Sequence, residues 1–97
     1  MKSLNNIKEI LSAMKPILNK KFDVSYIGVF GSVARGEAAE SSDIDILVDY
    51  SSTPSLFQLI ELEESLKDAL GCEIDLVYKP DLKKYIGRQV LKEVIPV

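Results

Sequence analysis

The sequence predicts a small α/β fold, in which helices pack on a mixed β-sheet. Two observations lead to this prediction. Apolar residues recur at three-and-four spacing in three segments, and three short apolar runs of the kind found in buried strands lie between and beside those segments. With 97 residues the chain has room for one compact domain, 1–97, and not for a second one.

The first helix is predicted from an apolar stripe that begins just after Ser3, which is a suitable N-cap. The stripe consists of Leu4, Ile7, Leu11, Met14 and Leu18. Pro16 lies inside this stripe and should kink or split the helix, because proline removes one backbone donor and clashes with the preceding turn. A short buried strand, Val24–Phe30, follows and ends at Gly31-Ser32, after which residues 33–39 have room for one or two helical turns.

The second strand, 43–48, follows a serine pair, and a second long helix comes after it. Thr53-Pro54 is a good helix start, since it places a capping hydroxyl before a proline at the first helical position. A helix over 55–70 would end at Gly71 as the C-cap. Its inner side is predicted to carry Leu56, Leu59, Ile60, Leu66 and Leu70.

A third strand, 73–78, is predicted to stop at Lys79-Pro80, and a last helix follows it. Asp81 is a candidate cap for this helix, while Gly87 weakens it. The helix would place Leu82, Ile86, Val90 and Leu91 toward the sheet. The expected element order is therefore helix, strand, short helix, strand, helix, strand, helix.

Composition narrows the possible functions. The chain is 46% apolar and 28% charged, and no stretch approaches the ~18 apolar residues of a membrane span. The N-terminus lacks the apolar stretch of a signal peptide. We therefore expect a cytoplasmic protein with no membrane partner. With no histidine and one cysteine, Cys72, the usual zinc sites, an internal disulfide and a histidine base are excluded. The net charge of −3 argues against direct nucleic-acid binding.

Two aspartates lie inside the second predicted strand, where aspartate is a poor choice for the backbone. Because side chains alternate along a strand, Asp43, Asp45 and Leu47 share one face, while Ile44, Ile46 and Val48 enter the core from the other. In the third strand Asp75 repeats the pattern. If the two strands are neighbours, the sequence predicts a cluster of Asp43, Asp45 and Asp75.

Three carboxylates repel one another unless a cation lies between them. Oxygen ligands without histidine or thiolate suit a hard ion, Mg²⁺ or Mn²⁺. Two such ions bridged by aspartates stabilise the entering and leaving oxygens in phosphoryl or nucleotidyl transfer. The alternative is that these aspartates are ordinary surface residues on a solvated face of the sheet. It is disfavoured because two aspartates occupy alternate positions of one strand and a third lies in another strand.

Gly31-Ser32 is a candidate phosphate contact. Glycine after a strand lets the backbone approach a ligand closely, and backbone N–H groups with the Ser32 hydroxyl can donate to an anion. Arg35, one helical turn beyond Ser32, can reach a triphosphate, although a surface ion pair with Glu37 is an equally good interpretation.

The run GSVARGEAAESSDIDILV, with a further aspartate in EIDLV, resembles the nucleotidyltransferase fold shared by DNA polymerase β, the CCA-adding enzymes and the aminoglycoside nucleotidyltransferases. The short chain is similar to the minimal nucleotidyltransferases, many of which are antitoxin partners of HEPN-domain ribonucleases. The resemblance implies a polymerase β palm-like fold. It also implies that Asp43 and Asp45 hold the metals and that Gly31 and Ser32 hold the triphosphate of ATP, while Asp75 completes one metal site and assists deprotonation of the acceptor.

The resulting hypothesis is a metal-dependent enzyme that moves AMP from ATP to a hydroxyl, and the resemblance adds that the acceptor is a tyrosine of a HEPN-type toxin. One alternative is a binding module that neutralises a partner protein by contact. An antibiotic- or tRNA-modifying transferase is disfavoured, because those enzymes need extra domains to hold the acceptor.

Overall fold

The computed structural model describes residues 3–37, 43–82 and 84–97. Four helices, four strands and one 3₁₀ helix occur in these ranges. In chain order they are α1 (Leu4–Phe22), β1 (Val24–Phe30), α2 (Gly31–Arg35), β2 (Ile44–Tyr50), α3 (Leu56–Leu70), β3 (Ile74–Tyr78), the 3₁₀ helix η1 (Lys79–Asp81), α4 (Lys84–Glu93) and β4 (Ile95–Pro96). The mixed α/β fold predicted from the sequence is confirmed.

The strands form one sheet in the order β3-β2-β1-β4. β1 pairs antiparallel with both β2 and β4, whereas β2 and β3 run parallel. A parallel pair needs a crossover connection, and α3 supplies it between β2 and β3. The β2–β3 register sets Asp45 directly opposite Asp75, so the neighbouring strands that the carboxylate cluster requires are present.

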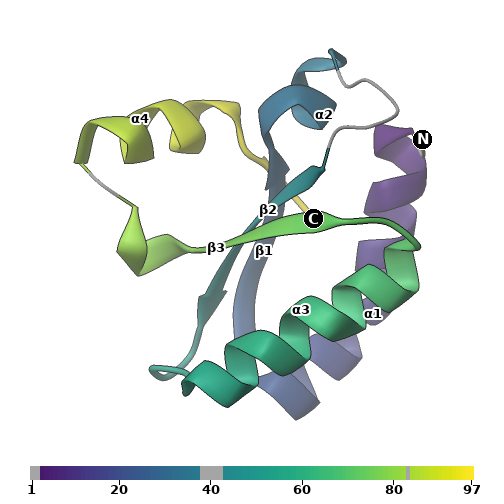
Figure 1. Ribbon diagram of the computed structural model, residues 1–97, viewed down its shortest axis with the longest axis vertical. Coiled ribbons are helices and arrows are strands. Elements are labelled where there is room, and N and C mark those ends of the chain that lie inside the picture. The colour runs from purple at the N-terminus through teal and green to yellow at the C-terminus, as the bar shows by residue number, and fades with distance from the viewer. Residues whose placement is uncertain (1–2, 38–42, 83) are drawn as a thin grey trace.

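The main core lies between one face of the sheet and the helices α1 and α3, which pack together on that side (Figure 1). From the sheet, Ile44, Ile46 and Val48 enter this core with no exposed surface, as the alternation along β2 predicted. The helices contribute Ile7, Leu11, Leu18, Phe22, Leu62, Leu66 and Leu70. At ~25 cal/mol per Å² of buried apolar area, this cluster is the main source of stability.

The opposite face of the sheet is covered near its middle. Leu47 is fully buried there although it lies outside the main core cluster, and Val90 of α4 is also buried. Gly28 is the β1 partner of Leu47, and a Cβ placed at Gly28 would meet Cγ2 of Val94, the residue between α4 and β4. The sheet is therefore sandwiched between α1 and α3 on one side and the end of α4 on the other.

The first long helix agrees with its prediction at the N-terminus. Ser3 caps α1, since its side chain accepts a hydrogen bond of 3.2 Å from the backbone N–H of Asn6. Pro16 does not split the helix, which continues from Leu4 to Phe22. Because Pro16 is exposed, the carbonyl that its missing N–H leaves without a helical partner can bond to water.

The predicted inner side of α3 was partly wrong. Leu66 and Leu70 are buried, but Leu56 and Ile60 are 71% and 49% exposed, and the fully buried Leu62 was missed. Ile60 stands two residues before Leu62, about half a helical turn away, so both cannot face the sheet. The helix also starts later than predicted: Ser55, and not Thr53, is the N-cap, in a capping box with Gln58.

Three further elements differ from expectation. The short helix α2 begins at Gly31 and ends at Arg35, while the remaining part of the predicted 33–39 segment beyond residue 37 lies outside the described residues. Asp81 belongs to η1 and does not cap α4, which starts at Lys84. Leu91 of α4 is 49% exposed, and the two-residue strand β4 was not predicted.

Candidate active site

Asp45 is the centre of the carboxylate group, and its position is set by the sheet. Its Cα is paired with Phe30 at the end of β1 and with Asp75 in β3, so it lies between two neighbouring strands. Adjacent strands are about 4.8 Å apart, which brings the side chains of Asp45 and Asp75 side by side on the same face. Asp43 comes immediately before β2 and is exposed, while Asp45 is half-buried.

Gly31 follows Phe30 and therefore lies against Asp45. A Cβ at Gly31 would overlap Oδ2 of Asp45, and the backbone of Gly31 has a φ of +74°, which side-chain-bearing residues rarely adopt. Both observations explain why the strand-to-helix turn contains glycine. The turn from β1 into α2 places the backbone directly beside the carboxylate, as expected for a glycine that allows close approach.

The carboxylates influence one another. Burial foremost, and then the charges of Asp75 and Asp43, raise the pKa of Asp45 above its ordinary value, whereas the positive charge of Arg35 lowers it. Asp45 therefore experiences both neighbouring carboxylates and the guanidinium. A cation bound beside Asp45 would remove the mutual repulsion and favour the ionised form.

Carboxylate oxygens are suitable donors for a hard divalent ion, and the chain contains no histidine. In the described ranges, however, no three His, Cys, Asp or Glu side chains are gathered closely enough to form a ready metal cluster. Like charges repel one another when no cation lies between them, and Asp43 and Asp75 are both exposed. The donor set and the Asp45–Asp75 pairing thus fit a divalent cation whose binding would draw these side chains together.

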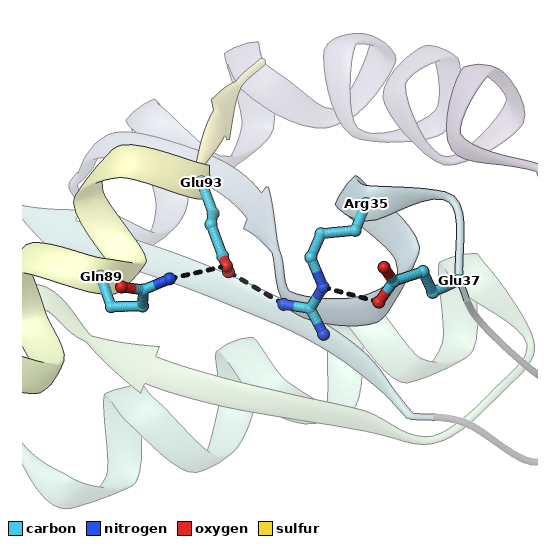
Figure 2. Close-up of polar contacts among 4 residues, drawn as sticks. All are labelled: Arg35, Glu37, Gln89 and Glu93. Atoms are coloured by element: carbon cyan, nitrogen blue, oxygen red, sulfur yellow. Dashed lines mark hydrogen bonds and ion pairs between the residues drawn. The ribbon is translucent and has the colours of Figure 1, made fainter.

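Arg35, the last residue of α2, is held by two glutamates in this structure (Figure 2). Its Nε donates to Oε2 of Glu37 at 2.9 Å, and its Nη1 donates to Oε2 of Glu93 at 3.0 Å. Both raise the pKa of Arg35, the hydrogen bond to Glu37 most of all. The ion pair between Arg35 and Glu37, one of the two interpretations of Arg35 from the sequence, is present. Arg35 also lies close enough to Asp45 to lower the pKa of Asp45.

Ser32 occupies the second position of α2, next to Gly31. Its backbone carbonyl accepts a 2.8 Å hydrogen bond from the N–H of Glu37, which closes the segment after the helix. The half-buried Ser32 side chain therefore belongs to the same turn that places Gly31 against Asp45.

Residues 12–97 match the family described as polymerase beta, nucleotidyltransferase. The chain belongs to this family. Its fold agrees with that membership, and the resemblance to a nucleotidyltransferase seen in the sequence is confirmed.

Proteins similar to this nucleotidyltransferase match nearly its whole length. A protein adenylyltransferase, MntA, from Thermococcus cleftensis is 53% identical over 97 residues, which is 100% of this chain and 98% of the relative. A crystal structure of a toxin-antitoxin with AMP-PNP has a TM-score of 0.74 and 27% identity, over 94% of this chain and 71% of that one. A complex of a tri-AMPylated Shewanella oneidensis HEPN toxin with an MNT antitoxin has a TM-score of 0.65 and 25% identity, over 94% of this chain and 67% of that one.

Two residues near Arg35, Glu93 and Gln89, were not predicted from the sequence to belong to the site. Glu93 contacts Arg35 from the end of α4, and Oε1 of Glu93 accepts a 3.2 Å hydrogen bond from Nε2 of Gln89. Glu93 and Arg35 are 58 positions apart. No local pattern in the sequence signals a contact over that separation, because it depends on how α4 returns toward α2.

Proposed function

We propose that this nucleotidyltransferase transfers AMP from ATP to a tyrosine hydroxyl of a HEPN-type toxin and thereby acts as its antitoxin in the cytoplasm. The observation that carries the chemistry is the pairing of Asp45 with Asp75 directly beside Gly31. The substrate and partner are supported by the adenylyltransferase name of the Thermococcus cleftensis relative and by the AMPylated HEPN toxin bound to a similar antitoxin. The complex with AMP-PNP supports ATP as the AMP donor.

The proposed site residues form two groups, the carboxylates that would hold the metal ions and the residues that would contact the triphosphate. Asp43, Asp45 and Asp75 would hold two Mg²⁺ or Mn²⁺ ions, which when bound neutralise charge on the phosphates. On the other side of Asp45, the backbone of Gly31 and the hydroxyl of Ser32 would contact the triphosphate, with Arg35 as a further phosphate contact. The overlap of a Gly31 Cβ with Asp45 supports this division, since phosphate contacts and carboxylates then lie within one small volume.

In the reaction the tyrosine oxygen attacks the α-phosphorus of ATP. The new bond joins that oxygen to phosphorus, and the bond between the α-phosphorus and the bridging oxygen breaks, so that pyrophosphate leaves with the bonding electrons. Asp75 is the exposed member of the Asp45–Asp75 pair and accepts the proton of the tyrosine hydroxyl. Added AMP would block the toxin by its bulk and its negative charge.

The test is to incubate the protein with ATP, Mg²⁺ and the protein encoded beside it, the candidate HEPN-type partner, and to measure the intact mass of that partner. We expect an increase of one or more AMP units, located on tyrosine by peptide fragmentation. The increase should disappear when Asp43→Asn and Asp45→Asn are combined, and it should require the divalent ion.

Asp49→Asn is the matched control, because Asp49 lies on the same strand and face as Asp45 but outside the carboxylate pair. Its side chain accepts a hydrogen bond from the N–H of Tyr50, which asparagine can also accept, so transfer should continue. An unmodified partner whose ribonuclease activity is nevertheless blocked would refute transfer and favour the contact-only binding module.

A further inference from the structure

The two glutamates that hold Arg35 differ in their surroundings. Glu37 follows Arg35 by two residues and its side chain is 65% exposed, whereas Glu93 comes from α4 and is 21% exposed. A second side chain, Gln89, donates to Glu93 from one helical turn earlier in α4. An ion pair that is shielded from water and held by a further hydrogen bond restrains its partners more than an exposed pair does. Glu93 is therefore the less exposed of the two partners and the one that is itself held in place, by Gln89.

Arg35 keeps donor capacity when both glutamates are bound. A guanidinium has five N–H donors in a fixed planar fork, and the two observed bonds use Nε and one hydrogen of Nη1. Figure 2 shows Nη2 pointing away from both carboxylates. Pairing with Glu93 and contact with a phosphate are thus compatible, and the pairing fixes the plane in which the remaining N–H groups point.

We propose that Glu93, supported by Gln89, is a positioning residue that directs the guanidinium of Arg35 toward a phosphate of the bound nucleotide. This inference rests on the proposed function, because it assigns a role to α4 at the same nucleotide site. Through this contact the end of α4, 58 positions from Arg35, becomes part of the nucleotide-binding apparatus.

A competing role for Glu93 predicts the opposite change in nucleotide affinity when the Glu93–Arg35 pair is lost. If Glu93 withheld Arg35 from the phosphates, loss of the pair would strengthen nucleotide binding. Glu93→Asp distinguishes the two roles, because it keeps the negative charge near the triphosphate but shortens the side chain by one methylene, so that the 3.0 Å contact with Nη1 is lost. The same change at the exposed partner, Glu37→Asp, is the matched control.

The measurement is the affinity for a non-hydrolysable ATP analogue with Mg²⁺, by titration calorimetry. Glu93→Asp should weaken binding by about five- to tenfold, as expected when a charge-assisted contact loses its alignment. Glu37→Asp should weaken it by less than about twofold, because exposed pairs contribute little. Equal weakening in both variants, or tighter binding in Glu93→Asp, would overturn the proposal.

A double-mutant cycle separates positioning from a general structural role. In an Arg35→Ala background, Glu93→Asp should produce no further loss of affinity, because the residue through which it acts is absent. If Glu93→Asp weakens binding equally in both backgrounds, it acts through the fold and the proposal is wrong. Wild-type protein that does not bind the analogue would refute the proposed function itself, whereas normal wild-type binding with an unchanged Glu93→Asp would refute only the role of Glu93.

Discussion

The two faces of β2 have opposite chemistry. One face presents Ile44, Ile46 and Val48, all without exposed surface, to α1 and α3. The other presents Asp45, Leu47 and Asp49, of which only Leu47 is fully buried. One strand of seven residues thus serves both as the centre of the core and as the support of the carboxylates.

The difference between these faces explains how aspartate is tolerated in the middle of a sheet. Complete burial of a large aliphatic side chain contributes about 1.5–3 kcal/mol, and three such residues anchor β2 from the core side. The raised pKa of Asp45 shows that its ionised form is disfavoured where it lies. The core face therefore fixes the strand firmly enough for the other face to hold mutually repelling charges at a set spacing.

The largest expected effect is the loss of stability when Ile46, at the centre of the core face of β2, is truncated. Ile46→Ala should lower the free energy of unfolding by about 2–5 kcal/mol, because it removes a fully buried side chain and leaves a cavity. Ile60→Ala, at a 49% exposed position of α3, should cost under about 1 kcal/mol. Urea denaturation of the two variants measures both effects, and similar costs would contradict the assigned burial.

An effect of intermediate size is expected on the carboxylate face, when Gly31 is replaced by alanine, and Gly36→Ala is the control. Both glycines have a φ of +74°, but a Cβ meets Asp45 at Gly31 and nothing within 4 Å at Gly36. Each change to alanine should cost about 1–2 kcal/mol of backbone strain, measured by denaturation. Gly31→Ala should in addition displace Asp45 and reduce AMP transfer, whereas Gly36→Ala should leave the transfer rate within about twofold. Equal transfer rates in the two variants would show that Gly31 does not constrain the site.

The smallest expected effect is a dependence of stability on pH, measured without divalent ions. The folded-state pKa of Asp45 is raised, by burial first and then by Asp75 and Asp43, so the folded protein binds the proton more tightly than the unfolded chain. The free energy of unfolding should therefore fall as pH rises from the ordinary value near 3.8 through the raised folded value. Asp45→Asn removes this contribution and should gain stability relative to wild type over that interval.

The comparison for this prediction is the difference between wild-type and Asp45→Asn denaturation midpoints at a series of pH values. Carboxyl groups far from Asp45 are the same in both proteins, so their contributions cancel in the difference. A difference that stays constant with pH would mean that Asp45 ionises in the fold as it does in the unfolded chain.

Local patterns were sufficient for most of the fold. The alternation of apolar and acidic residues placed Ile44, Ile46 and Val48 in the core, and β1 has the bounds that its apolar run predicted. The adjacency of Asp45 and Asp75 followed once β2 and β3 were neighbours, and a βαβ crossover makes that arrangement common. These features depend on residues close together in sequence or on one strand pairing.

The errors arose where tertiary context decides between equivalent patterns. Apolar residues surround much of α3, and spacing alone did not identify Leu62 as buried or Leu56 as exposed. The Ser55–Gln58 capping box was readable in the sequence, but Thr53-Pro54 offered a competing start. Glu93 could not be connected to Arg35 beforehand, because their contact depends on the orientation of α4 relative to α2.

The short strand β4 has a consequence for the order in which the chain folds. It pairs Ile95 with Val29, and the N–H of Val97 donates to the carbonyl of Ile27 at 3.0 Å. Lys15 in α1 also donates to the carbonyl of Val97 at 2.8 Å. These contacts close loops of most of the described chain, and such long-range closure is slow compared with helix formation. During synthesis β1 must therefore wait for residues 95–97 to leave the ribosome before its second edge is covered, and until then that edge is open to chaperones or to other nascent chains.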